Sequence, residues 1–267
     1  MKERVDVLAF KQGLFETREQ AKRGVMAGLV VDVATGERFD KPGMKLDDAT
    51  ELRLKGEKMR YVSRGGLKLE KALLTFDINL VDKVCLDIGS STGGFTDVML
   101  QNGAKQVYAL DVGTNQLAWK IRNDARVVVM EQFNFRQAVP ENFPRLPEFA
   151  SIDVSFISLD KILPPLYEIL VENGAVAALI KPQFEAGRAD VGKNGIIKDE
   201  KIHKKVLEQV LTMAVATGFS VENLTFSPIK GGAGNIEFLM HLTKNKMAKI
   251  AQNVSVARVL EEVKELS

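Results

Sequence analysis

The chain has 267 residues, 45% of them hydrophobic and 27% charged, which is enough for one large domain with a buried core, or a large and a small one. The formal net charge of +2 is compatible with nucleic-acid binding but does not demand it. One cysteine cannot form an intrachain disulfide, one cysteine with two histidines argues against a structural zinc site, and no apolar run is long enough to cross a bilayer.

The first 60 residues consist of short, charged segments that predict a small α+β domain. Met1–Asp6 is charged and indicates no secretory signal, so we expect a cytoplasmic protein. Thr17–Gln20 fits a capping box, and we expect a helix after it that Gly28 is suited to end. Leu29–Val33 and Thr50–Leu54 are predicted to be strands.

From residue 61 onward, predicted strands and helices alternate in a long series. The expected strands are Val84–Ile88, Gln106–Leu110, Arg126–Met130, Phe149–Asp153, Ala175–Ile180, Ser220–Phe226 and Ile236–Leu242. The expected helices are Ser63–Leu74, Phe95–Gln101, Gln116–Arg122, Leu159–Val171 and Glu200–Ala216. This alternation predicts an α/β fold, a mostly parallel Rossmann-like sheet with helices on both faces.

The end of the series departs from this alternation. The last two strands are joined by the glycine-rich segment 230–235 without a helix, so they should form an antiparallel pair at one edge. A simple dinucleotide-binding sheet lacks this ending. Residues 247–267 are predicted to form a final helix that packs on the rest of the chain through one apolar side.

A glycine-rich turn, Asp87–Phe95, follows the first strongly apolar strand. In open α/β sheets, ligands bind beyond the carboxyl ends of the strands, and glycines let a ligand approach the backbone. Asp111 ends the next strand, where a carboxylate can accept both ribose hydroxyls of an adenosine, and Asn134 follows the third strand, where it could meet the adenine. We predict a nucleoside site, with NAD as the competing ligand although the G-x-G-x-x-G spacing is absent. Its candidate residues are Asp87, Gly89, Ser90, Gly93, Gly94, Phe95, Asp111 and Asn134.

Four further polar residues are expected at the ends of elements beside this site: Lys68, Asp153, Lys181 and Glu237. Lys181 directly follows an apolar strand, which is the position of a candidate general base. Burial and a second cation, which Lys68 could supply, favour the neutral form of a lysine, whereas nearby carboxylates oppose it. A surface ion-pair network is the alternative interpretation.

These stretches resemble the TlyA family of haemolysin-named ribosomal RNA 2′-O-methyltransferases. Its members join an S4 RNA-binding domain to a methyltransferase domain of the FtsJ type. The resemblance covers residues 3–243 and rests on Arg4–Leu8, Thr17–Ala21, Val62–Leu69, Asp87–Phe95, Asp153–Phe156, Lys181–Glu185 and Gly231–Glu237. It implies an S4-like domain over residues 1–60 and a methyltransferase domain over residues 61–245, followed by a C-terminal helix over residues 246–267.

The resemblance also implies the chemistry. S-Adenosylmethionine (SAM) would be the cofactor, no metal would be needed, and ribosomal RNA or a ribosomal subunit would be the partner, with the oligomeric state left open. The family's Lys-Asp-Lys-Glu tetrad falls on Lys68, Asp153, Lys181 and Glu237, with Lys181 as the base that a poorly nucleophilic ribose hydroxyl requires. Asp87 would face the cationic methionine end of the cofactor. The residues expected to contact RNA phosphates are Arg4, Lys11, Arg18, Lys22, Arg23 and Arg64.

Three alternatives remain at this point. Methylation of a base nitrogen usually goes with an Asp/Asn-Pro-Pro-aromatic turn, and Asp153–Phe156 has the acid and the aromatic residue but neither proline. A membrane-lysing toxin, which the family's historical name suggests, lacks support from any signal peptide, membrane span or strongly amphipathic basic helix. A non-catalytic RNA-binding factor would fit only if the cofactor failed to bind.

Overall fold

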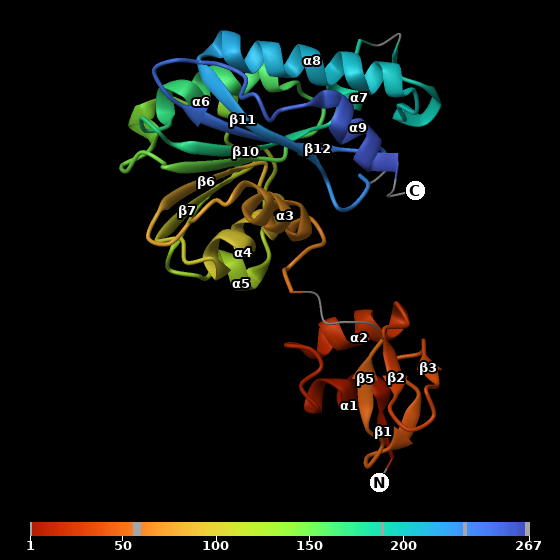
Figure 1. Ribbon diagram of the computed structural model, residues 1–267. Coiled ribbons are helices and arrows are strands. Elements are labelled where there is room, and N and C mark those ends of the chain that lie inside the picture. Colours follow the sequence, from red (N-terminus) through yellow and green to blue (C-terminus); the bar gives the residue numbers. More distant parts are fainter. Residues whose placement is uncertain (1, 56–59, 188–189, 232–233, 265–267) are drawn as a thin grey trace. The chain divides into compact units, whose positions relative to one another are not determined.

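The computed structural model describes residues 2–55, 60–187, 190–231 and 234–264 (Figure 1). The chain divides into two compact units, Met1–Arg60 and Tyr61–Ser267. Part of the predicted turn at 230–235 and the last three residues of the predicted C-terminal helix lie outside the described residues.

The N-terminal unit packs two helices against a small antiparallel sheet. The helices are α1 (Val5–Lys11) and α2 (Arg18–Met26). The sheet has the order β3 (Arg38–Phe39), β2 (Val30–Asp32), β5 (Leu52–Leu54), and β1 (Lys2–Arg4) pairs separately with β4 (Lys45–Asp47). Side chains from both helices and the three-stranded sheet form its core, including Val5, Ala21, Val25, Val30 and Phe39.

Capping residues correctly predicted α2, whereas several shorter elements were not predicted. The Thr17 side chain accepts a hydrogen bond from the Gln20 backbone N–H at 3.2 Å, and Gly28 adopts a φ of +66° just after the helix, as the capping pattern predicted. The two predicted strands are present as the shorter β2 and β5. The sequence pattern did not predict β1, β3 and β4, because two or three residues are too few to show a period, and it did not predict α1, which has only seven residues.

The second unit is built on a seven-stranded, mostly parallel sheet. In sheet order its strands are β11 (Phe219–Phe226), β12 (Phe238–Lys244), β10 (Ala175–Ile180), β9 (Phe149–Ile152), β6 (Val84–Ile88), β7 (Gln106–Leu110) and β8 (Val127–Met130). β12 runs antiparallel to both of its neighbours, which confirms the predicted antiparallel pair. The pair lies at one side of the sheet. Within it, β11 is the edge strand and β12 lies between β11 and β10.

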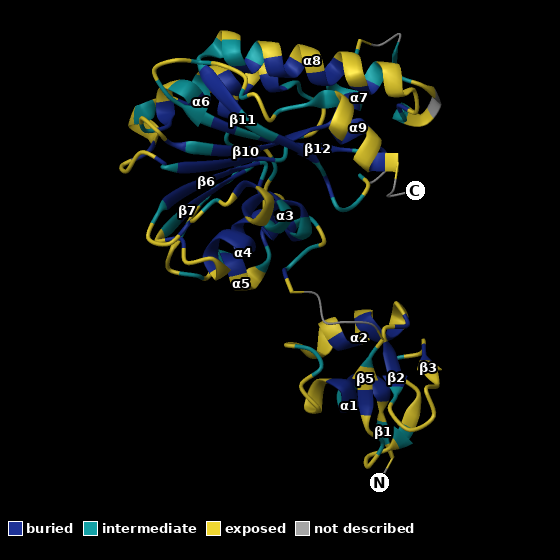
Figure 2. Ribbon diagram, viewed as in Figure 1, coloured by how far each residue is buried: buried dark blue, intermediate teal, exposed yellow. Residues whose placement is uncertain are grey.

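Helices cover both faces of this sheet, as predicted. One face carries α3 (Gly66–Phe76), α4 (Gly94–Gln101) and α5 (Trp119–Arg122), and the other carries α6 (Leu163–Ile169), α8 (Glu200–Thr217) and α9 (Val256–Lys264). Figure 2 shows the strands as the buried layer between them. Within the described parts, no helix combines the length and the apolar character needed to span a membrane.

Three predicted helices are shorter than expected, and one of them is α5, which includes only Trp119–Arg122 of the predicted Gln116–Arg122. The helix predicted over Leu159–Val171 is divided into a 3₁₀ turn, η3 (Leu159–Lys161), and α6, which has proline in its first turn. Proline lacks a backbone N–H and is well tolerated only at a helix start, so a new helix begins there. In the predicted C-terminal helix, only α9 is helical, and Ile250 before it forms a bridge with Val221 of β11.

Candidate active site

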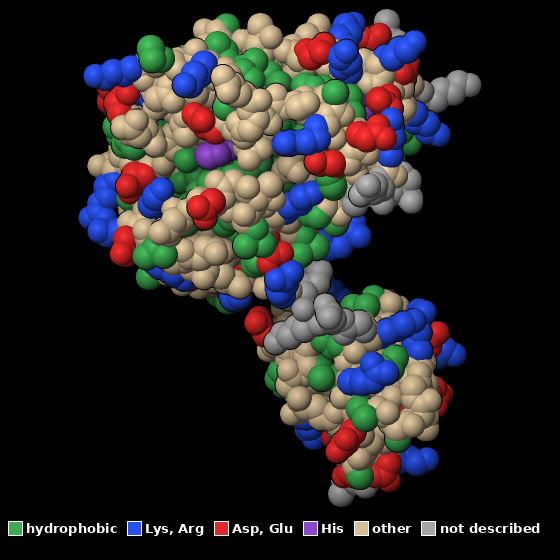
Figure 3. All heavy atoms as spheres, viewed as in Figure 1, with side chains coloured by type: hydrophobic (Ala, Val, Ile, Leu, Met, Phe, Trp, Pro, Cys, Tyr) green, Lys and Arg blue, Asp and Glu red, His purple; other side chains and the backbone are tan. Residues whose placement is uncertain are grey.

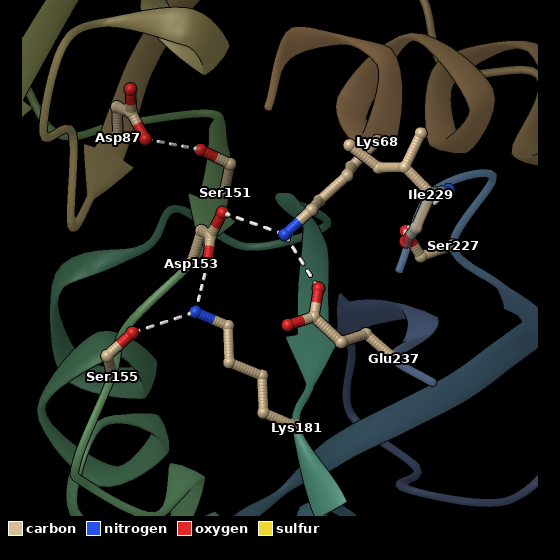
Figure 4. A network of polar contacts seen from close by, with 9 residues as sticks. All are labelled: Lys68, Asp87, Ser151, Asp153, Ser155, Lys181, Ser227, Ile229 and Glu237. Carbon is tan, nitrogen blue, oxygen red and sulfur yellow. Dashed lines mark hydrogen bonds and ion pairs between the residues drawn. The ribbon is translucent and has the colours of Figure 1, made fainter. Parts of the chain in front are cut away.

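Four charged side chains from separate elements meet at the edge of the sheet where the parallel strands end (Figure 4). Lys68 lies on α3, Asp153 follows β9, Lys181 follows β10, and Glu237 immediately precedes β12. Because β12 is antiparallel and pairs its first residue with the last residue of β10, Glu237 and Lys181 arrive at the same edge. The structure therefore brings together all four residues of the predicted tetrad.

The tetrad is a chain of alternating charges. Lys181 Nζ lies 2.5 Å from Asp153 Oδ1. Lys68 Nζ lies 3.7 Å from Asp153 Oδ2 and 2.6 Å from Glu237 Oε2. Lys181 also donates a hydrogen bond to Ser155 Oγ at 3.0 Å. Two cations and two anions balance one another, which a buried cluster requires because an unpaired buried charge is very costly.

Burial separates this cluster from a surface ion-pair network. Lys68 and Lys181 are each 8% exposed and Glu237 is 3% exposed. All four members nevertheless line a cavity of about 520 Å³, so a ligand can reach them. The alternative interpretation of the tetrad, a solvated surface network, does not fit this arrangement.

The glycine-rich turn after β6 allows the backbone to pass close to this cluster. Gly89 has a φ of +87°, and a Cβ there would lie 2.4 Å from the backbone oxygen of Asp153. A Cβ on Gly94 would lie 2.3 Å from Ser63 Oγ, at the start of the segment that leads into α3. These two glycines therefore let the strand ends and α3 approach each other closely enough to assemble the tetrad.

Asp87, at the end of β6, is fully buried behind the turn. Its two carboxylate oxygens accept hydrogen bonds from Thr96 Oγ1 at 2.7 Å and Ser151 Oγ at 3.0 Å. Burial raises the pKa of Asp87 to about 6, although the two hydroxyl donors pull it downward. The carboxylate thus ties β6 to α4 and β9. Its predicted contact with the methionine end of a cofactor stays a prediction.

Replacing Asp87 by asparagine should change how stability depends on pH. Because the pKa of Asp87 is about 6 in the folded chain and lower in the unfolded chain, the folded state binds more protons between pH 4 and 6. The wild type should therefore lose stability as pH rises through this window, by up to about 3 kcal/mol relative to Asp87→Asn. Urea unfolding of both proteins from pH 4 to 7 measures this difference, and parallel curves would contradict it.

A second cavity, of about 590 Å³, adjoins the first. The two share five lining residues, namely Gly89, Ser91, Asp153, Ser155 and Phe156. The second cavity extends over the ends of β7 and β8, where Asp111 and Asn134 line it as predicted. Its volume falls within the range of small-molecule sites.

Asp111 holds the turn and still faces the cavity. Its Oδ2 accepts the backbone N–H of Ser91 at 2.8 Å, and its Oδ1 accepts that of Gly113 at 2.8 Å. A carboxylate has about four lone-pair sites, so two remain for the hydroxyls of a ribose. Asn134 accepts hydrogen bonds from the Arg136 backbone N–H at 3.2 Å and from its Nε at 3.3 Å, which fixes its amide.

The structure divides the predicted cofactor residues into two groups. Gly89, Asp111 and Asn134 line the cavities. The others are placed behind that surface and shape the turn instead; they are Asp87, Ser90, Gly93, Gly94 and Phe95. Phe95 packs in the core between the sheet and α3. Contact of this second group with a cofactor stays a prediction.

The sequence analysis missed one conspicuous residue of the cavity wall, Phe156. It is 90% exposed, has a φ of +64°, and its ring lies 4.9 Å from that of Phe184. Phe156 lines both cavities and Phe184 lines the one that holds the tetrad. The sequence shows Phe156 as an aromatic residue three positions after Asp153, the acid that follows a strand. That pattern does not indicate that the ring is exposed.

The predicted RNA-contacting residues of the N-terminal unit are exposed and paired with acids. Figure 3 shows Lys and Arg side chains interspersed with Asp and Glu over this unit. The pairs are Arg4–Asp6 (2.9 Å), Arg18–Asp6 (3.6 Å), Lys11–Glu3 (2.8 Å), Lys22–Glu19 (4.0 Å) and Arg23–Glu19 (3.7 Å). Asp6 is buried, which raises its pKa, but Arg4 and Arg18 outweigh burial and the pKa is lowered. Arg64, in the second unit, is exposed and forms no ion pair within the described residues.

The fold is that of a solved structure from Listeria monocytogenes provisionally described as a SAM-dependent methyltransferase, which is 18% identical, with a TM-score of 0.51 over 68% of this chain and 99% of that one. The profile of the FtsJ-like methyltransferase family matches residues 61–244, and the chain belongs to this family.

The most similar relatives extend this result to the N-terminal unit. The chain is 56% identical to a Bacillus subtilis protein provisionally named rRNA methyltransferase YqxC, over 98% of this chain and 94% of that one. It is 39% identical to the 16S/23S rRNA (cytidine-2′-O)-methyltransferase TlyA of Mycobacterium tuberculosis, over 90% of this chain and 89% of that one. A solved structure provisionally described as a hemolysin from Streptococcus thermophilus is 65% identical, with a TM-score of 0.79 over 99% of this chain and 96% of that one. The resemblance to the TlyA family is thereby confirmed.

Proposed function

We propose that this chain is a SAM-dependent methyltransferase that modifies a ribose 2′-hydroxyl of ribosomal RNA, with Lys181 as the general base. The observation that carries the proposal is the buried tetrad in a cavity that adjoins a nucleoside-sized one. The two cavities meet at Gly89 and Asp153, so two ligands bound in them would be neighbours.

The residues of the second cavity fit SAM. Asp111 offers free lone pairs for the ribose, Asn134 and Phe135 line the side over β8, and Gly89 lines the cavity without a side chain. When bound, SAM supplies a methyl group on a sulfonium sulfur. The cofactor requires no metal, because the sulfonium itself is the leaving group.

The tetrad would act on the hydroxyl in the neighbouring cavity. Lys181, an ammonium in the ion pair with Asp153, would have to give up one proton before the step; its amine would then take the proton of the hydroxyl as that oxygen is methylated. Asp153, 2.5 Å from Nζ, stabilises the ammonium that results. Lys68 is held by Glu237 and orients the second oxygen of Asp153, so that the carboxylate keeps facing Lys181.

The N-terminal unit would bind the RNA as an S4-like domain, using its exposed helical face. Basic residues such as Arg4 and Arg23 are paired with acids in this unit, and each would exchange that partner for a phosphate on binding RNA. The relative from Mycobacterium tuberculosis is named for methylation of cytidine in 16S and 23S rRNA. We infer the same class of substrate for this chain. Because ribosomal subunits are in the cytoplasm, we also infer that the protein acts there.

The proposal is tested by incubating the purified chain with radiolabelled SAM and separated ribosomal subunits, then digesting the RNA to nucleosides. Label in a 2′-O-methylated nucleoside is the expected result. Label on a base would instead favour the N-methylation alternative. Absence of transfer with SAM binding intact would move the substrate elsewhere, and absence of SAM binding would leave an RNA-binding factor.

Phe156 should contribute to RNA recognition. Its exposed ring, paired with Phe184 at the wall of both cavities, is suited to stack on a base that has left its helix. Stacking on an aromatic side chain is worth about 1–3 kcal/mol per base, so Phe156→Ala should lower kcat/KM for RNA by about 5- to 150-fold. Steady-state kinetics at saturating SAM measure this effect. Phe156→Tyr should retain activity, and a similar loss in that variant would show that stacking is not the cause.

A further inference from the structure

A short segment between α7 (Pro182–Glu185) and α8 forms one wall of the cavity that holds the tetrad. Its 3₁₀ turn, η5 (Lys193–Gly195), places two successive residues, Asn194 and Gly195, in the left-handed region, with φ of +63° and +71°. Both residues line the cavity, together with Lys68 and Lys181. Most other residues that line this cavity come from the ends of strands or from α3 and α7.

A single buried side chain fastens this segment. Asn235 is 2% exposed, and its Nδ2 donates to the backbone oxygen of Gly195 at 2.8 Å. Its Oδ1 accepts the backbone N–H of Ile197 at 2.9 Å. Only an amide side chain offers a donor and an acceptor side by side in this way, and asparagine has the shorter stem. The side chain thus replaces the strand partner that the segment lacks.

The same asparagine belongs to the turn that presents Glu237. It lies two residues before Glu237, and its backbone oxygen accepts the N–H of Gly231 at 2.9 Å. A Cβ on Gly231 would lie 2.4 Å from Glu237 Oε1, so this turn closes tightly around the carboxylate. Asn235 therefore links the position of the wall segment to that of the tetrad.

We propose that Asn235 is a positioning residue that holds residues 194–197 as the acceptor-side wall, and that the Asn194 side chain contacts the nucleotide that receives the methyl group. This inference rests on the proposed function and names residues that select its RNA substrate. Asn194 is exposed to the cavity, and its side chain makes no hydrogen bond to another described residue. Its amide can both donate to and accept from a base edge or a ribose.

Two variants test the two parts separately. Asn235→Leu keeps a similar volume but removes both the acceptor for Ile197 and the donor to Gly195, so the segment should detach. Asn194→Gly keeps the left-handed turn, which glycine adopts readily, and removes only the side chain. We expect kcat/KM for ribosomal RNA to fall at least about tenfold in the first variant and about three- to tenfold in the second, with SAM affinity within about twofold of wild type.

Hydrogen exchange at the Ile197 amide supplies a readout that does not depend on RNA. Protection should be lost in Asn235→Leu and retained in Asn194→Gly. The matched control is Asn245→Leu, because Asn245 also donates and accepts through its amide, to Thr243 Oγ1 and from Ser220 Oγ, but lies outside both cavities. It should leave RNA kinetics unchanged.

The outcomes separate the inference from the function on which it rests. Loss of protection without a change in RNA kinetics would overturn it, as would an equal loss of SAM binding and methyl transfer, which indicates general damage to the site. Retained protection in Asn235→Leu would also overturn it. Failure of the proposed function would be seen separately, as absence of methyl transfer by the wild type. In that case the acceptor role of this wall would also be wrong.

Discussion

Lys181→Ala should abolish methyl transfer while leaving SAM binding and the fold intact. General bases typically contribute about 10²- to 10⁴-fold to a rate, so kcat should fall within that range. The fold should survive because Asp153, the carboxylate released by the change, keeps Lys68 at 3.7 Å. Single-turnover transfer from labelled SAM to ribosomal subunits measures the rate, and calorimetric titration with SAM measures binding.

Lys181→Arg is the matched control for charge. Arginine keeps the cation beside Asp153 but cannot give up its proton in a protein, so it should be as inactive as alanine. If Lys181→Arg or Lys181→Ala retained more than about a tenth of the wild-type kcat, general-base catalysis by this residue would be wrong. Removal of a general base should lower kcat by about 10²-fold or more.

Glu237→Leu should be the most destabilising single change at this site. The Lys68 side chain is 9% exposed and its Nζ lies 2.6 Å from Glu237 Oε2. Removing the carboxylate leaves a buried ammonium with only the more distant Asp153 as a partner. Breaking a buried pair in this way typically costs about 3–5 kcal/mol, which urea unfolding would detect as a shifted midpoint.

The double variant Lys68→Met/Glu237→Leu should regain most of that stability and stay inactive. Replacing a buried ion pair by apolar side chains of similar volume is often neutral for stability, because no charge is left without a partner. Activity should not return, since Asp153 would lose the cation that orients its second oxygen. A double variant no more stable than Glu237→Leu would show that the loss comes from packing and not from charge.

Continuous apolar runs were sufficient to locate the inner strands. Val84–Ile88, Gln106–Leu110 and Ala175–Ile180 were predicted with the bounds that the structure shows. Strands buried on both faces are mostly apolar, with exceptions such as Asp87, so the local sequence indicates where they begin and end. The glycine-rich turn was also predicted from local sequence. So was the helix start at Thr17, where a side chain accepts a hydrogen bond from a backbone N–H three residues later.

Long-range contacts account for what the pattern could not predict. The place of β12 inside the sheet depends on pairing with β10, which is some 60 positions earlier in the chain. Ile250 was expected to be helical, yet it bridges to Val221 instead. In both cases the preference of the local sequence is weak, and hydrogen bonds to a distant strand determine the conformation.

The candidate site shows the same division. Local sequence was enough to identify Lys68, Asp153, Lys181 and Glu237, because polar residues at the ends of apolar strands are conspicuous. Their distances, the burial that raises the pKa of Asp87, and the exposure of Phe156 follow from packing between elements. Lys68 and Glu237 are 169 positions apart, and only the antiparallel register of β12 brings them to 2.6 Å. Local preferences act over a few residues, whereas a site is made of atoms that become neighbours only when the sheet closes.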